Sequence, residues 1–180
     1  ATPEARIREL CAASRGFVYA VTVKGITGGG RALPAEVTGY LDGVKVSVTS
    51  TGIGCPSSAI AMEELVRVGA KTFIRVGTSG SIQPGTKSGE LAIVSGAIRD
   101  EGTSSHYMPI EFPAVADLEV VQALRAAATA KNLPFRVGIS QSKDSFYGEV
   151  EPEHSGVTSR LLDRWRAWEI GGAICSEMEA

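Results

Sequence analysis

The chain has 180 residues, of which 43% are hydrophobic and 21% charged, and its formal net charge is −2. This composition is typical of a globular protein with a substantial core, and the small negative charge argues against a general nucleic-acid binder. No apolar run approaches the roughly 20 residues that span a bilayer, and three widely spaced cysteines and two histidines predict reduced thiols in the cytoplasm and no metal site.

Strand and helix patterns alternate along the chain and predict an α/β fold. Asp42-Gly43 lies between two β-branched segments and predicts a hairpin. The expected elements are a helix over 3–13, a strand over 17–23, a loop over 27–31, hairpin strands over 36–41 and 44–49, a helix over 56–68, strands over 71–76 and 91–95, a helix over 114–130, a strand over 135–140, a helix over 158–170 and a strand over 172–176. The strand over 71–76 is expected to be largely buried. We expect one domain over 1–180, a mixed sheet flanked by helices.

The ends of the sequence suggest a longer parent chain. The last residues, Glu177-Met178-Glu179-Ala180, follow an expected buried strand, where another helix should come next. The first residue is not methionine, and it stands directly at the entrance of a helix. We therefore expect the sequence to be incomplete, above all at its C-terminus.

The segment 50–60, STGIGCPSSAI, joins a β-branched strand to an amphipathic helix. Gly52 and Gly54 allow a sharp turn and a close approach of the backbone to a ligand, and Pro56 fits a first helical position. A strand, a glycine turn and a helix start together favour the binding of an anion or a sugar. A tight turn without a ligand is the alternative interpretation.

Extended to Glu64 and Leu65, this segment resembles the signature of the nucleoside phosphorylase family (PNP/UDP family 1). Residues 73–84, FIRVGTSGSIQP, resemble the family's phosphate-binding strand and turn, and 177–179, EME, resemble its ribose-binding motif. Residues 111–117, EFPAVAD, and 143–148, KDSFYG, resemble the uridine phosphorylases of the family more than its purine enzymes. The resemblance extends from about 44 to 180, and it implies the family's mixed, partly barrel-like sheet.

The resemblance implies a phosphate site built from arginines and a turn. Arg75 is the first candidate, because its planar guanidinium matches phosphate oxygens; a structural arginine paired with a carboxylate is the alternative. Thr78 offers a hydroxyl and a backbone amide to phosphate and ribose. Arg6 and Arg31 resemble two further phosphate-binding arginines of the family, one of them reaching in from a neighbouring subunit. For both, a solvated surface arginine is the alternative.

The same resemblance implies ribose and base sites. Glu179 would accept hydrogen bonds from the ribose hydroxyls, with Met178 against the sugar and Glu177 supporting the site. The base-binding candidates are Phe146, Ser79, Gly80 and Glu149. Glu149 departs from the family, where glutamine is usual: an ionised glutamate accepts hydrogen bonds but cannot donate them. It is therefore protonated, displaced from the base, or part of a site with another base preference.

The function that the resemblance implies is phosphorolysis of uridine to uracil and ribose 1-phosphate in pyrimidine salvage. Phosphate is a co-substrate and no cofactor is expected. The expected assembly is a homo-oligomer, a dimer or a hexamer, with shared sites and without nucleic acid or membrane. The alternatives are a purine nucleoside phosphorylase or a nucleosidase of the same fold, or a nucleoside-binding member without activity.

Overall fold

The computed structural model describes residues 38–41 and 44–180, and side chains from 48 onward. The chain divides into two compact units, one formed by Ala1–Gly52 and Ser57–Phe73 and the other by Ile53–Pro56 and Ile74–Ala180. The helix expected over 3–13, the strand over 17–23, the loop over 27–31 and the two arginines Arg6 and Arg31 lie outside the described residues.

The first unit contains a hairpin and most of one helix. Strands β1 (Thr38–Leu41) and β2 (Val44–Ser47) pair antiparallel, which confirms the predicted hairpin. Helix α2 (Cys55–Arg67) confirms the helix expected over 56–68. Gly52 has φ of +77°, and a Cβ there would come 2.5 Å from Ser57 Oγ, whose hydroxyl donates to the Thr51 carbonyl. This turn therefore requires glycine.

The buried strand predicted over 71–76 is wrong. These residues form no helix or strand, and the side chains of Ile74 and Val76 are 55% and 41% exposed. A short apolar segment forms a strand only where a second strand supplies hydrogen-bond partners, and no described strand pairs with this segment. The segment also crosses the boundary between the two units at Phe73 and Ile74.

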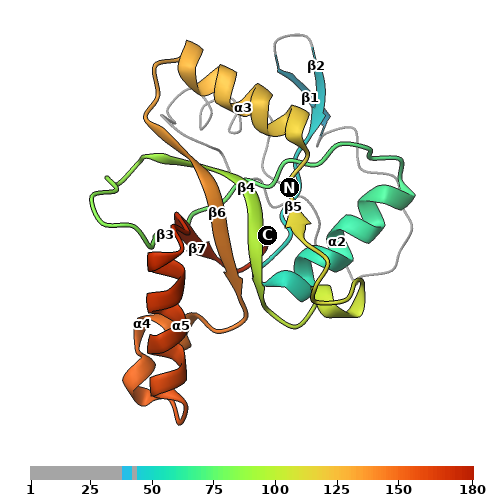
Figure 1. Ribbon diagram of the computed structural model, residues 1–180. Helices are drawn as coiled ribbons and strands as arrows, with labels where there is room; N and C mark the ends of the chain where they lie inside the picture. Colours follow the sequence, from blue (N-terminus) through green and yellow to red (C-terminus); the bar gives the residue numbers. More distant parts are fainter. Residues whose placement is uncertain (1–37, 42–43) are drawn as a thin grey trace, which may run out of the picture. The chain divides into compact units, whose positions relative to one another are not determined.

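The second unit is built on a five-stranded mixed sheet of order β3-β7-β6-β4-β5 (Figure 1). The strands are β3 (Gly80–Ser81), β4 (Leu91–Asp100), β5 (Ala114–Val115), β6 (Phe135–Lys143) and β7 (Cys175–Glu177). The three inner strands β4, β6 and β7 run parallel, and the two short edge strands pair antiparallel. The mixed α/β fold is thus confirmed, and within the described residues the sheet is open.

Helix α3 (Leu118–Ala130) connects two parallel strands and packs on β4 and β6 (Figure 1). Val121 and Ala128 on this helix and Ile93 on β4 form the buried core, with Leu91 and Phe135 beside them. The helix expected from 114 begins four residues later. The Asp117 side chain accepts the Val120 amide at 3.0 Å and starts the helix, while Ala114–Val115 pair with β4 instead.

The last third of the chain forms α4 (Phe146–Val150), the 3₁₀ turn η3 (Pro152–His154) and α5 (Thr158–Ile170). α5 has the predicted bounds. The final strand begins at Cys175 rather than at 172, because Gly172 at φ of +81° and the Ala173 amide, bonded to the Trp168 carbonyl, complete the end of α5. Another turn, η2 (Ser104–His106), follows β4.

Along the described part of the chain, no helix combines the length and apolarity needed to cross a membrane.

Candidate active site

Polar side chains gather where the parallel strands end. β4, β6 and β7 finish at Asp100, Lys143 and Glu177, and their registers place these ends at one edge of the sheet. Buried polar residues there are Ser140, Gln141, Ser142, Lys143, Ser176 and Glu177. Ligands of open α/β sheets bind at the carboxyl ends of parallel strands. Because buried polar groups cost free energy unless they are paired, this edge is the strongest site candidate in the second unit.

Arg75 is held between two carboxylates at this edge. Its Nη1 lies 3.2 Å from Glu177 Oε2, and its Nη2 forms an ion pair with Glu179. The Glu177 side chain is only 1% exposed and also accepts the backbone amides of Glu179 and Ala180, each at 2.7 Å. Glu177 therefore shapes the turn that presents Glu179, while Arg75, 34% exposed, remains open on one side.

The glycine turn before α2 reaches the same place. The Gly54 amide donates to Glu179 Oε1 at 3.0 Å, so one carboxylate joins residues 104 and 125 positions earlier in the chain. Gly54 has φ of +91°, a conformation that glycine adopts without strain. The Glu179 carboxylate thus binds both Gly54, from the segment 50–60, and Arg75, from the segment 73–84.

Cys55 follows Gly54 and is buried against the strand ends. Its Sγ lies 3.4 Å from Ser142 Oγ and 3.3 Å from the Met178 carbonyl. Burial raises the pKa of the Cys55 thiol to about 11, and the hydrogen bond with Ser142 only partly opposes this effect. The thiol is therefore a packing group rather than a nucleophile.

This environment predicts slow alkylation of Cys55. Thiolate is the reacting form, and a pKa raised from 9.0 to about 11 lowers its fraction about a hundredfold near pH 8. Iodoacetamide labelling, read by peptide mass spectrometry, should modify Cys55 in the folded protein at least a hundredfold more slowly than in urea. Equal rates in the two conditions would contradict the burial of this thiol.

Glu149 lies at a second cluster on the same edge. Ser145 caps helix α4, because its Oγ accepts the Gly148 amide at 3.0 Å, and the helix turns Glu149 back toward β6. Glu149 Oε2 lies 2.5 Å from Lys143 Nζ and 2.5 Å from Ser176 Oγ. A Cβ placed on Gly80 would lie 3.7 Å from Glu149 Oε1. Two of the predicted base-binding residues, Gly80 and Glu149, are therefore neighbours.

The remaining predicted residues lie around these two clusters. Thr78 is exposed in the turn before β3. Burial raises the pKa of the Cys175 thiol, and the Ser79 hydroxyl partly opposes this shift. Phe146 is 53% exposed on α4, with the Tyr147 ring edge-on at 5.5 Å between centroids. Met178 is half-buried between the two glutamates.

Comparison with known proteins decides the family. A family model described as the phosphorylase superfamily matches residues 9–180. The chain belongs to this superfamily. The match includes every predicted site residue of the second unit, as well as Arg31.

Several members of the superfamily are close in sequence. The uridine phosphorylase of Treponema pallidum is 50% identical over 143 residues, which is 79% of this chain and 55% of that protein. The uridine phosphorylase of Thermococcus kodakarensis is 55% identical over 120 residues, 66% of this chain and 43% of that protein. A guanosine phosphorylase of Halorubrum lacusprofundi is 44% identical over 144 residues, 80% of this chain and 55% of that protein. The chain spans about half the length of the curated relatives it matches.

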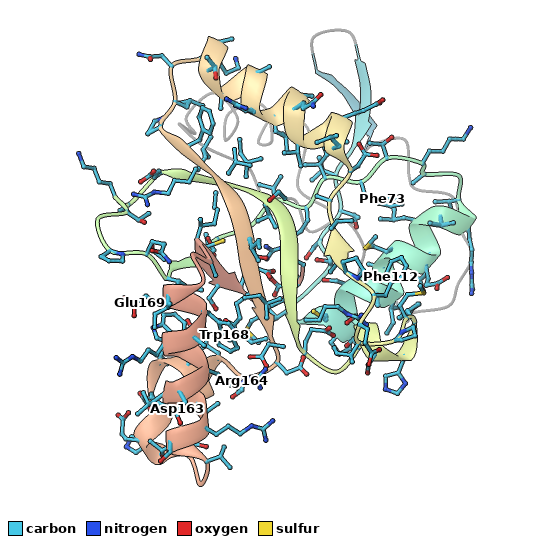
Figure 2. The ribbon with its side chains drawn as sticks, viewed as in Figure 1. Phe73, Phe112, Asp163, Arg164, Trp168 and Glu169 are labelled. Carbon is cyan, nitrogen blue, oxygen red and sulfur yellow. The ribbon has the colours of Figure 1, made fainter. Side chains whose placement is uncertain are left out.

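Sequence reasoning missed the side chains that are linked to Glu149 through Ser176. Gln141 Nε2 donates to Asp100 Oδ2 at 2.8 Å, and Asp100 forms an ion pair with Arg164 of α5. Arg164 also stacks over the Trp168 ring, and both residues lie on α5 in Figure 2. The polar run Ser140-Gln141-Ser142-Lys143, at the end of a strand that begins apolar, was the available signal.

Proposed function

We propose that this protein catalyses phosphorolysis of a nucleoside, with uridine as substrate and uracil and ribose 1-phosphate as products. The observation that carries the proposal is the convergence on Glu179 of the Gly54 amide and the Arg75 guanidinium. Three motifs that are distant in the sequence are in contact there, and the proposal assigns them to the sugar and the phosphate. The named uridine phosphorylases among the relatives support the choice of uridine.

The proposed chemistry is a direct displacement. A phosphate oxygen forms a bond to C1′ of the ribose while the C1′–N1 bond breaks, and uracil leaves with the bonding electron pair before it takes up a proton. Arg75 would bind phosphate, with Thr78 beside it and with Arg6 and Arg31 as further ligands. Glu179 would accept the ribose hydroxyls, with Met178 against the sugar, and Glu177 would hold the turn. Phe146, Ser79, Gly80 and Glu149 would face the base.

The reaction needs phosphate and no cofactor, and a cytoplasmic homo-oligomer with shared sites is the assembly that we propose for it. Arg75 alone faces two carboxylates, so the described cluster carries a net negative charge. A phosphate dianion requires additional positive charge there. Arg6 and Arg31 are the proposed source of that charge.

A substrate panel tests the proposed function. Uridine, inosine and guanosine are incubated with the purified protein, with and without phosphate, and base release is followed by chromatography. Phosphate-dependent release of uracil, faster than release of either purine, is expected. Faster release of guanine would favour the second candidate, a guanosine phosphorylase, which the Halorubrum relative supports. Release without phosphate would indicate a nucleosidase, and no release from any nucleoside would overturn the proposal.

Gly80 offers a more local test of the base site. Gly80→Ala adds a methyl group in ordinary contact with Glu149 Oε1, at 3.7 Å, and no positive φ strains the backbone there. We expect an unchanged melting temperature and a KM for uridine raised about tenfold, because the methyl group occupies space intended for the base. The KM for phosphate should stay the same.

Gly156→Ala is the matched control for this variant, because a Cβ at Gly156 meets nothing within 4 Å. It should leave both KM values unchanged. An unaltered KM for uridine in Gly80→Ala would place the base elsewhere.

A further inference from the structure

The Lys143–Glu149 pair is the least expected feature of the site. The Lys143 side chain is 8% exposed and that of Glu149 is 16% exposed, so both charges are largely removed from water. Such burial is unfavourable unless each group is paired and hydrogen-bonded. Lys143 Nζ meets both Glu149 Oε2 and Ser176 Oγ, and these contacts compensate the ammonium.

The pair uses the two oxygens of Glu149 differently. Oε2 faces Lys143 and Ser176, inside the protein. Oε1 faces Gly80, and this glycine has no side chain to fill the space in front of it. Because Oε2 is engaged by Lys143 and Ser176, the carboxylate offers a ligand a single acceptor, Oε1, on the side of Gly80.

Further polar side chains hold Ser176, and through it the Lys143–Glu149 pair, in place. Asp100 accepts Gln141 Nε2, which leaves Gln141 Oε1 facing Ser176 Oγ at 2.6 Å. Asp100 is held in turn by Arg164 of α5. A polar chain of six residues therefore ties α5, β4, β6 and β7 to the carboxylate: Arg164, Asp100, Gln141, Ser176, Lys143 and Glu149.

We propose that Lys143 is a positioning residue that makes glutamate usable for base recognition, by holding Glu149 as an ionised acceptor with Oε1 directed toward Gly80. The proposal rests on the function proposed above. It names the substrate class further: a nucleobase that presents a ring N–H to Oε1, as uracil does with N3–H. Lys143 also offsets the glutamate charge, which would otherwise oppose a base that leaves as an anion.

The test is a double-mutant cycle with Lys143→Met, Glu149→Gln and the double variant, measured with uridine and with 3-methyluridine, which lacks the N3–H. Lys143→Met should lower kcat/KM for uridine about 10- to 100-fold, because the carboxylate loses its partner. The KM for phosphate should not change. Since glutamine needs no cation, adding Lys143→Met to Glu149→Gln should cost less than threefold.

Two further variants sharpen the cycle. Lys143→Arg keeps the positive charge and should retain more activity than Lys143→Met. Lys131→Met changes an exposed lysine at the end of α3 and is the control, with no expected effect. The preference for uridine over 3-methyluridine should shrink at least tenfold in Lys143→Met, a change that a general loss of folded protein would not produce.

Thermal unfolding of the wild-type protein, Lys143→Met, Glu149→Gln and the double variant shows whether a negative result concerns the positioning role or the proposed function. Lys143→Met should lower the melting temperature, and Glu149→Gln should restore part of the loss in the double variant. If this stability coupling is present but Lys143→Met lowers kcat/KM by the same factor in both backgrounds, the positioning role is overturned while the proposed function stands.

If the wild-type protein releases no base, uracil binding is measured by calorimetry for the four proteins of the cycle. Absence of uracil binding would overturn both proposals, and binding without coupling would overturn the positioning role.

Discussion

Arg75→Ala is expected to lower kcat/KM for phosphate by about 10²–10³-fold, the effect typical of removing one charged group that stabilises a transition state. The structure indicates a second unfavourable effect of this substitution, a repulsion between two carboxylates. Without the guanidinium, the carboxylates of Glu177 and Glu179 face each other's charge at the same edge of the sheet. Initial rates at varied phosphate and saturating uridine measure the effect.

Two variants make this result interpretable. Arg75→Lys keeps the charge but loses the planar fork that spans Glu177 and Glu179, and it should recover part of the activity. Arg125→Ala removes an exposed arginine on α3 and should behave as wild type. Wild-type kcat/KM in Arg75→Ala would show that Arg75 is a structural partner of the two carboxylates and not a phosphate ligand.

Glu177→Gln is expected to have the largest effect on stability, about 1–3 kcal/mol, the typical cost of leaving a buried hydrogen-bonding group without its partner. Glu177 Oε2 accepts two backbone amides and faces Arg75 Nη1 at 3.2 Å. Glutamine has one acceptor oxygen in place of two, and its NH2 group is itself a donor. It therefore cannot accept hydrogen bonds at both positions where the carboxylate oxygens of Glu177 now lie. The turn that presents Glu179 should therefore loosen, and kcat/KM for uridine should fall together with stability.

Urea unfolding and initial rates at a temperature where the variant stays folded separate the two consequences of Glu177→Gln. Glu153→Gln, in an exposed turn, is the control and should change neither quantity. A Glu177→Gln protein as stable and as active as wild type would contradict the role of Glu177 as the buried anchor of the site.

The sequence predicted best those elements whose local signals agree with their surroundings. α5 has its predicted bounds because Leu161, Trp165 and Trp168 share one helical face and Gly171-Gly172 follow directly. β4 extends beyond the predicted strand to Asp100 because residues 96–100 pair with β6, although the last two, Arg99 and Asp100, are charged. The strand expected over 71–76 failed for the opposite reason, since an apolar pattern cannot reveal whether a neighbouring strand is available.

The candidate site shows the same division. The motifs around Gly54, Arg75 and Glu179 were recognisable one by one, and the structure brings these three residues into contact. The pairing of Lys143 with Glu149 could not be read from the sequence. It depends on α4, a helix of five residues that is missing from the predicted elements and that turns Glu149 back onto the end of β6.

The products formed from uridine and phosphate test the central proposal most directly. Phosphorus NMR of the reaction, with uracil measured in parallel, should show ribose 1-phosphate appearing in a one-to-one ratio with uracil. With Arg75→Ala, the initial rate at which this signal appears should be at least about a hundredfold lower under the same conditions. Uracil accompanied by free ribose, or no uracil at all, would contradict the assignment of this strand-end cluster to phosphorolysis.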